Sequence, residues 1–150
     1  MKPIGLIAVV TVVLFIAGFA CSGGGSGPTD SGNNGDGNRP AFVTFSGSVQ
    51  PIFTARCALS ECHAGSAPVQ DMSLEPGKAF ADIVNVESNV ATLKRIRPFL
   101  PDSSYLVHKI QGTQTTVGGS GARMPLRNCC LSQDEIDVIR TWVKAGAPNN

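Results

Sequence analysis

The chain has 150 residues, of which 42% are hydrophobic and 15% are charged, and its formal net charge is +1. Because positive and negative charges nearly balance, the chain has neither the basic excess that binds nucleic acid nor a net charge that strongly attracts an acidic partner. The five cysteines are many for so short a chain, and they indicate disulfides, a zinc site or haem attachment.

The first residues are typical of an exported protein. Lys2 precedes the apolar run of residues 4–20, which reads IGLIAVVTVVLFIAGFA, and Cys21 follows directly. This resembles a bacterial lipoprotein signal, in which a small residue stands before a cysteine that becomes lipidated. We therefore expect residues 1–20 to be a signal peptide and Cys21 to anchor the protein in the bacterial cell envelope, on the periplasmic or outer-membrane side. The alternatives are an ordinary signal-peptidase cut and an uncleaved anchor helix.

A linker is predicted next. Residues 22–40 contain seven glycines and no large apolar side chain. Such a segment buries too little surface to offset the entropy of ordering it. We therefore assign residues 21–40 to the lipidated cysteine and a flexible tether spanning roughly 25 Å. Residues 41–150 remain as one folded domain.

Three shorter helices are expected within this domain. The first runs through residues 49–57 with Ser48 as its N-cap, the second covers residues 77–84, and the third covers residues 102–110 with Asp102 as its cap. Gly112 provides the stop signal for the third helix.

The fourth helix has the clearest signals. Ser132 and Glu135 have the spacing of a capping box, and Gly146 marks the end. No segment shows sustained strand alternation, so the sequence predicts an all-α domain with long irregular connections such as residues 111–131. Six apolar side chains are expected in the core: Phe53, Tyr105, Leu106, Ile136, Ile139 and Trp142.

The strongest chemical motif consists of Cys57, Cys62 and His63. In covalent haem attachment, two thiols bond the vinyl groups at one edge of the porphyrin, and a histidine directly after the second thiol ligates the iron. The usual spacing leaves two residues between the cysteines, whereas four lie between them here. The same side chains also suit a zinc site with Cys129 or Cys130 as fourth ligand, or a plain disulfide.

The flanking segments extend the pattern over most of the domain. The motif lies in VQPIFTARCALSECHAG. Three segments follow it in this order: YLVHKIQG, a glycine-rich stretch ending in ARMP, and LSQDEIDVIRTWVKAGAP. Together they resemble the monohaem cytochrome c domains of the class I and planctomycete-type families. The resemblance implies a small helical domain around one haem c, which is bonded to Cys57 and Cys62 and has His63 as its proximal iron ligand.

The resemblance also implies a distal ligand from a Met-Pro loop, and Met124 before Pro125 matches it. A thioether favours ferrous iron, so a His/Met pair raises the reduction potential relative to two imidazoles. The alternative ligand is His108, which would give a bis-histidine site. Met72 follows His63 too closely in the sequence to reach the opposite haem face, and we expect it to pack in the loop beneath the ring. Two arginines, Arg97 and Arg123, are candidates for pairing with a haem propionate.

The remaining cysteines, Cys129 and Cys130, are adjacent. Free neighbouring thiols do not persist well in an oxidising compartment, and no third partner is left for them. We therefore consider a vicinal disulfide that stiffens the turn before the last helix, with an incidental pair of thiols as the alternative.

Filled axial positions leave the iron no open site for a substrate, so one-electron transfer is the expected chemistry. The expectation is an electron carrier, not an enzyme, that exchanges electrons with redox proteins at the membrane. Two alternatives stay open. One is a haem enzyme or gas-binding protein with an open sixth position, and the other is a zinc-stabilised binding module of an envelope complex.

Overall fold

The chain becomes helical before the position that the sequence predicted. In the computed structural model, which describes residues 42–127 and 129–150, a π-helical turn η1 (Phe45–Val49) leads into α1 (Gln50–Arg56). Thr44 is the N-cap, because its side chain accepts a hydrogen bond from Gly47 N at 3.0 Å. The prediction that Ser48 caps this helix was wrong, since Ser48 lies within η1 and its hydroxyl accepts from Thr44 N.

The two middle helices are short, and α2 (Ala79–Ile83) lies within the predicted range. The third, α3 (Tyr105–Gln111), follows a 3-10 turn η3 (Pro101–Ser103). The prediction that Asp102 caps α3 was wrong, because Asp102 lies in η3. Its Oδ1 instead pairs with Arg140 Nη1 at 2.8 Å. Gly112 ends α3 in the left-handed region at φ 79°, which confirms the predicted stop.

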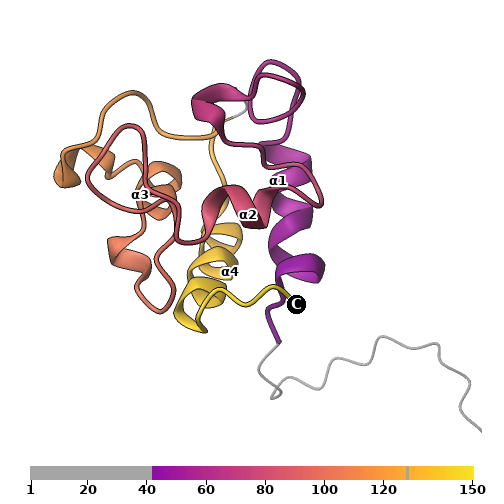
Figure 1. Ribbon diagram of the computed structural model, residues 1–150. Coiled ribbons are helices and arrows are strands. Elements are labelled where there is room, and N and C mark those ends of the chain that lie inside the picture. The colour runs from indigo at the N-terminus through magenta and orange to yellow at the C-terminus, as the bar shows by residue number, and fades with distance from the viewer. Residues whose placement is uncertain (1–41, 128) are drawn as a thin grey trace, which may run out of the picture. The chain divides into compact units, whose positions relative to one another are not determined.

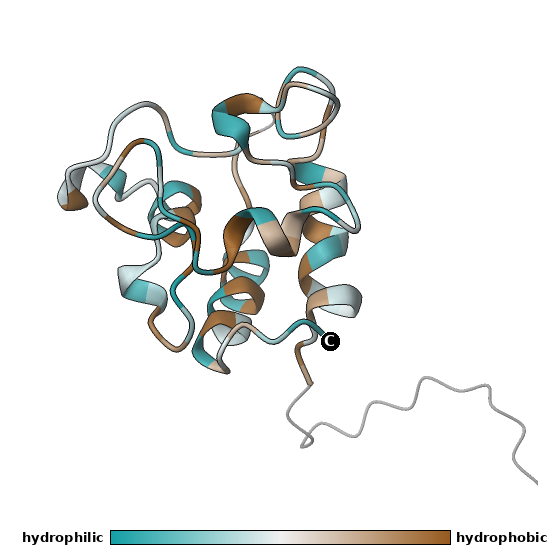
Figure 2. Ribbon diagram, in the orientation of Figure 1, coloured by the Kyte–Doolittle hydropathy of each residue, from teal (hydrophilic) through white to brown (hydrophobic). Residues whose placement is uncertain are grey.

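The predicted capping box of the last helix, α4 (Gln133–Lys144), is confirmed. Ser132 Oγ accepts from Glu135 N at 3.2 Å, and a Glu135 carboxylate oxygen accepts from Ser132 N at 2.7 Å. Figure 2 shows apolar and polar residues on different faces of this helix. The apolar face is buried, so α4 is held by its packing as well as by its cap.

The core lies where α4 packs against η1 and α3 (Figure 1). Trp142 is fully buried, and its ring centroid lies 5.1 Å from that of Phe45. Its indole N–H donates to Pro148 O at 2.9 Å, so the burial leaves no unpaired donor. All six side chains predicted for the core are buried: Phe53, Tyr105, Leu106, Ile136, Ile139 and Trp142.

Long connections join these helices. Two further 3-10 turns occur in them, η2 (Val69–Asp71) and η4 (Gln114–Val117). The described residues contain three isolated β-bridges and no strand, and the fold class is all-α. Figure 1 shows the connection between α3 and α4 as an extended orange trace, and this trace forms one wall of the cavity described next.

Candidate functional site

A cavity of about 370 Å³ lies between the end of α1, the segment after it, α3 and the connection that precedes α4. Its wall is mainly apolar, and its volume falls within the range of about 300–1,000 Å³ that is usual for cofactor sites. The four residues predicted to hold a haem, Cys57, Cys62, His63 and Met124, all line it. Since Met124 is distant from the others in sequence, the tertiary fold alone brings it to this cavity.

A tight turn after α1 presents the two cysteines. Cys57 N donates to Phe53 O at 2.8 Å and so continues the helix by one residue. The chain then reverses, because Cys62 N donates to Leu59 O at 3.0 Å and His63 N donates to Cys57 O at 3.3 Å. The four residues between the cysteines thus form a closed turn, and the longer spacing still leaves both thiols on the same cavity.

The chemical state of the thiols is consistent with attachment to a ligand. Cys57 and Cys62 are half-buried and free of disulfides. Burial is the main cause that raises the pKa of Cys57 to about 12, so this thiol is protonated at neutral pH. Within residues 42–127 and 129–150, no three His, Cys, Asp or Glu side chains converge as a metal site. The ligand set that a zinc module needs is therefore not assembled in this part of the chain.

His63 is held in one tautomer. Its Nδ1 lies 3.1 Å from Met72 O, and because a carbonyl only accepts, Nδ1 carries the proton and Nε2 keeps a free lone pair. Burial lowers the pKa of His63 below its usual value, against the opposing effect of backbone hydrogen bonds to Met72 and Val69. The ring is thus neutral at pH 7, which is the form that ligates a metal.

Met124 reaches the cavity from residues 119–125, which we call the methionine loop. Met124 N donates to Lys109 O at 2.9 Å, and this bond fastens the loop to α3. Pro125 is buried directly after it and restricts the backbone that carries the thioether.

The alternative ligand His108 does not line the cavity. Its Nδ1 lies 2.8 Å from Thr113 Oγ1, and its Nε2 lies 3.0 Å from Asp102 O. Both ring nitrogens are therefore engaged at the ends of α3, and the geometry favours Met124 over His108 as the distal group.

Arg95 is a lining residue that the sequence did not single out. It is only 6% exposed, although arginine is normally a surface residue. Its guanidinium donates to Gln70 O at 2.7 Å, Asp82 O at 2.8 Å and Asp71 O at 3.2 Å. None of the ion pairs among the described residues includes Arg95. A buried positive charge therefore lies at the cavity without a carboxylate partner from the described chain.

The two arginines that the sequence offered as propionate partners lie elsewhere. Neither Arg97 nor Arg123 lines the cavity. Arg97 is exposed, and Arg123 Nε donates to Ile110 O at 2.8 Å. No signal in the run from Lys94 to Arg97 distinguishes the buried arginine from the exposed one, since it is the carbonyls of distant segments that surround Arg95.

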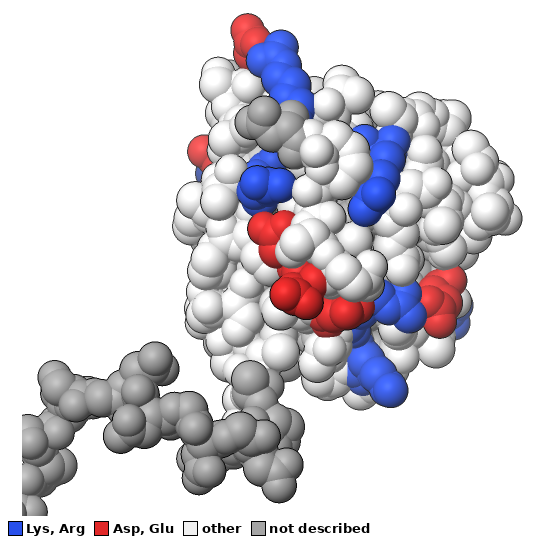
Figure 3. Space-filling view, turned by 180° about the vertical axis from the view of Figure 1, so that it is seen from behind, with Lys and Arg blue, Asp and Glu red and all other residues white. Residues whose placement is uncertain are grey.

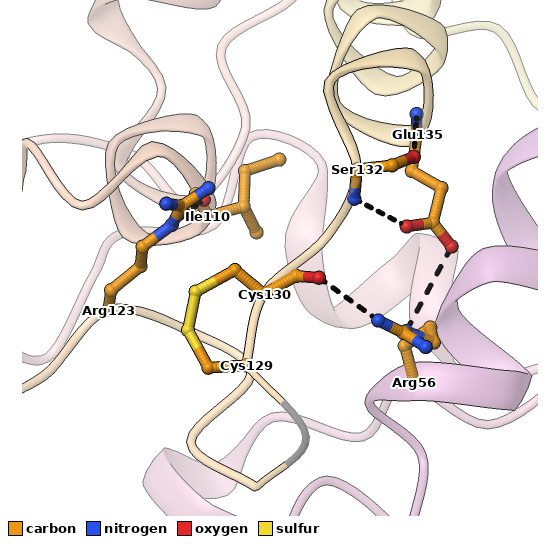
Figure 4. The surroundings of a disulfide bond; sticks show 7 residues. All are labelled: Arg56, Ile110, Arg123, Cys129, Cys130, Ser132 and Glu135. Atoms are coloured by element: carbon orange, nitrogen blue, oxygen red, sulfur yellow. Dashed lines mark hydrogen bonds and ion pairs between the residues drawn. A yellow bond between two sulfur atoms is a disulfide. The ribbon is translucent and has the colours of Figure 1, made fainter.

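Cys129 and Cys130 lie between the methionine loop and α4, and a disulfide joins them (Figure 4). Arg56 Nη2 donates to Cys130 O at 3.0 Å, and Arg56 Nε lies 3.9 Å from Glu135 Oε1. Since Arg56 directly precedes Cys57, these contacts tie the turn that carries the disulfide to the start of the cavity wall.

The lining of the cavity combines exposed apolar side chains with an excess of positive charge. Three lining side chains are exposed and apolar, namely Leu59, Val69 and Leu126. Beside them Arg127 Nη2 lies 3.9 Å from Glu61 Oε2, whereas the lining residues Arg56, Arg95 and Lys109 add positive charge that no lining carboxylate balances. On the face shown in Figure 3, basic and acidic groups are interspersed and most of the surface is uncharged.

The predicted signal peptide of residues 1–20, the lipidation site Cys21 and the whole linker of residues 21–40 lie in residues 1–41, which are outside the described residues. Of the helices that the structure does describe, none has both the length and the apolar character needed to cross a bilayer.

The site therefore consists of two free thiols, one neutral imidazole, one thioether and one buried cation around a single apolar cavity. Comparison of the chain with protein-family models, with curated proteins and with solved structures gives no match, so the geometry of the site and the pattern of the sequence carry the functional argument.

Proposed function

We propose that this protein is a membrane-tethered electron carrier with one covalently bound haem c. Cys57 and Cys62 would form the thioether bonds, and His63 and Met124 would ligate the iron. The observation that carries the proposal is the convergence of these four side chains on one cavity of cofactor size. Cysteine, histidine and methionine are the residue types that attachment and axial ligation of haem c require.

The thiol chemistry supports covalent attachment. Addition of a thiol to a vinyl group forms one carbon–sulfur bond, and the thiol hydrogen passes to the neighbouring vinyl carbon, so no external oxidant is consumed. Both cysteines are available, since neither belongs to a disulfide.

The imidazole and the cation support the same occupant. His63 offers Nε2 to iron while Met72 O fixes its ring. Arg95 supplies a positive charge at the cavity that no carboxylate among the described residues pairs with. Burying such a charge is unfavourable unless an anion compensates it. Haem fits, because its two propionates would provide that anion.

Bound haem would supply reversible one-electron chemistry at its iron. The protein's part would be to offer His63 and Met124 as iron ligands, which would exclude other ligands, and the thioether of Met124 would raise the potential. The exposed apolar side chains Leu59, Val69 and Leu126 then allow a redox partner to approach the cavity in a brief contact. The signal-like residues 1–20 and Cys21 would keep this exchange at a membrane of the cell envelope.

The test is expression of the full chain with export and haem-attachment machinery, followed by intact mass and absorption spectra. We expect one haem per chain and, in the ferric state, the far-red band of an iron–thioether bond. Met124→Leu should abolish that band while keeping the haem. Met72→Leu is the matched control, because Met72 lines the same cavity but engages His63 through its backbone carbonyl.

Other results would favour the alternatives. Wild-type protein that lacks the band and binds cyanide or carbon monoxide rapidly indicates an open sixth position, and hence a haem enzyme or gas-binding protein. Colourless protein that carries zinc indicates the binding module of an envelope complex. Loss of the band in Met72→Leu but not in Met124→Leu would assign the distal ligand to Met72.

A further inference from the structure

The methionine loop has no secondary structure, yet it is tightly fastened at its backbone. Three successive carbonyls, those of Ser120, Gly121 and Ala122, each accept a side-chain hydrogen bond. All of these donors come from α3 and η4, and none from the loop itself. The position of the loop over the cavity is therefore decided by groups on neighbouring elements.

Lys109 is the central donor. Its Nζ lies 2.6 Å from Ala122 O and 3.1 Å from Ser120 O, while its own carbonyl accepts from Met124 N at 2.9 Å. Lys109 thus holds the loop at Ala122 and at Met124, on either side of Arg123. Lys109 also lines the cavity, so its ammonium lies at the boundary between the loop and the ligand space.

Two further contacts restrict the loop but do not duplicate this one. Gln114 Nε2 donates to Gly121 O at 2.6 Å from η4. A Cβ on Gly119 would collide with the ring of Tyr105, so the loop backbone passes so close to that ring that only glycine fits there. Both contacts act before Ala122. Next to Met124 the loop is held by Lys109 and by Arg123, whose Nε donates to Ile110 O at 2.8 Å, and Lys109 is the one of the two that lines the cavity.

We propose that Lys109 is a positioning residue, which holds the methionine loop so that the Met124 thioether stays in place to ligate the haem iron. This inference rests on the proposed function and extends it to a residue that does not touch the iron. Pre-ordering the loop reduces the entropy lost when the sulfur binds. A loosened loop would release the thioether more often and open the sixth position to competing ligands.

The test compares three variants of the haem-loaded, full-length protein. Lys109→Leu removes the ammonium and keeps an apolar stem, Lys109→Arg retains donors for the two carbonyls, and Lys78→Leu is a matched control. Lys78 pairs with Glu75 at 2.8 Å, is exposed and does not line the cavity. The readouts are the far-red band, the dissociation constant of cyanide for the ferric form, and the covalent haem content.

We expect Lys109→Leu to keep its haem, to weaken the band and to bind cyanide about tenfold more tightly. The effect is smaller than the full strength of two charged hydrogen bonds, because both bonds are exposed to solvent and only part of their loss reaches the thioether. Lys109→Arg should restore wild-type values, and Lys78→Leu should match wild type. Adding Lys109→Leu to Met124→Leu should leave cyanide affinity unchanged, because the effect passes through the thioether. An unchanged band and cyanide affinity in Lys109→Leu would overturn the inference, and so would an additive effect in the double variant.

If Lys109→Leu does not fold, Lys109→Met takes its place, since it also removes the ammonium that binds the Ser120 and Ala122 carbonyls and keeps an unbranched apolar stem. We then expect a weaker band and tighter cyanide binding, and wild-type values would overturn the inference. Failure of the proposed function is distinguishable. It would appear as absence of covalent haem in the wild type, or as a band that persists in Met124→Leu.

Discussion

Replacing Arg95 by methionine measures what a buried cation contributes to this site. Methionine keeps an apolar stem and removes the guanidinium, which makes three hydrogen bonds to backbone carbonyls. Hydrogen bonds from a charged donor contribute about 1.5–3 kcal/mol each, but removing the guanidinium also removes the cost of burying an unpaired charge, so the free energy of unfolding should fall by about 3 kcal/mol. With a urea dependence of about 1.5 kcal/mol per molar, the midpoint moves down by about 2 M.

The matched control is Arg97→Met, two residues further along. Arg97 is exposed and does not line the cavity, so we expect its replacement to change stability by less than about 0.5 kcal/mol. Urea denaturation followed by circular dichroism gives both values. Equal midpoints for the two variants would refute the reasoning that the Arg95 hydrogen bonds stabilise the fold.

The same pair tests whether the cavity holds an anion. If a haem propionate compensates Arg95, the loss of stability in Arg95→Met should be larger in haem-loaded protein than in protein made without haem attachment. An equal loss in both preparations would show that the charge is satisfied by the backbone carbonyls alone.

Three further predictions concern the frame of the site. Ser132→Ala removes the capping box of α4 and should lower stability by about 1 kcal/mol in thermal unfolding, whereas no change in melting temperature would contradict it. Trp142→Phe loses the hydrogen bond to Pro148 O and leaves a void, so we expect the free energy of unfolding to fall by about 2 kcal/mol. A fall of less than about 0.5 kcal/mol would show that the core relaxes around the smaller ring. His63 has a lowered pKa, so as pH falls below 6.5 the unfolded chain binds more protons than the folded one. Protein without haem should therefore be stable above that pH and lose stability below it, and His63→Gln should flatten this part of a urea-midpoint profile.

The helices show which local signals suffice. The capping box at Ser132 and the stop at Gly112 were predicted correctly, because both depend on residues within one turn of the helix end. Ser48 and Asp102 were wrong as caps. At those positions a competing partner decides: Thr44 begins the first helix earlier, and Arg140 from α4 pairs with Asp102.

The residues of the candidate site also fall into those that the sequence predicted and those that only the structure identified. Cys57, Cys62 and His63 lie in one short segment, so their proximity was predictable from residue order, and the structure adds the turn that brings both thiols to one cavity. Met124 was expected from the resemblance of its loop. Arg95 and Lys109 were not expected, because nothing in their local sequence distinguishes them from solvated basic residues.

The sequence by itself determined the residue types of the site, the helical class and the ends of the last helix, since these follow from short-range patterns. Only the tertiary structure decided that Met124 meets His63 at one cavity, that Arg95 is the buried cation, and that Lys109 holds the methionine loop. The physical reason is that burial and hydrogen-bond partners depend on segments far apart in the chain. The carbonyls around Arg95 and those around Lys109 come together only when the domain has folded.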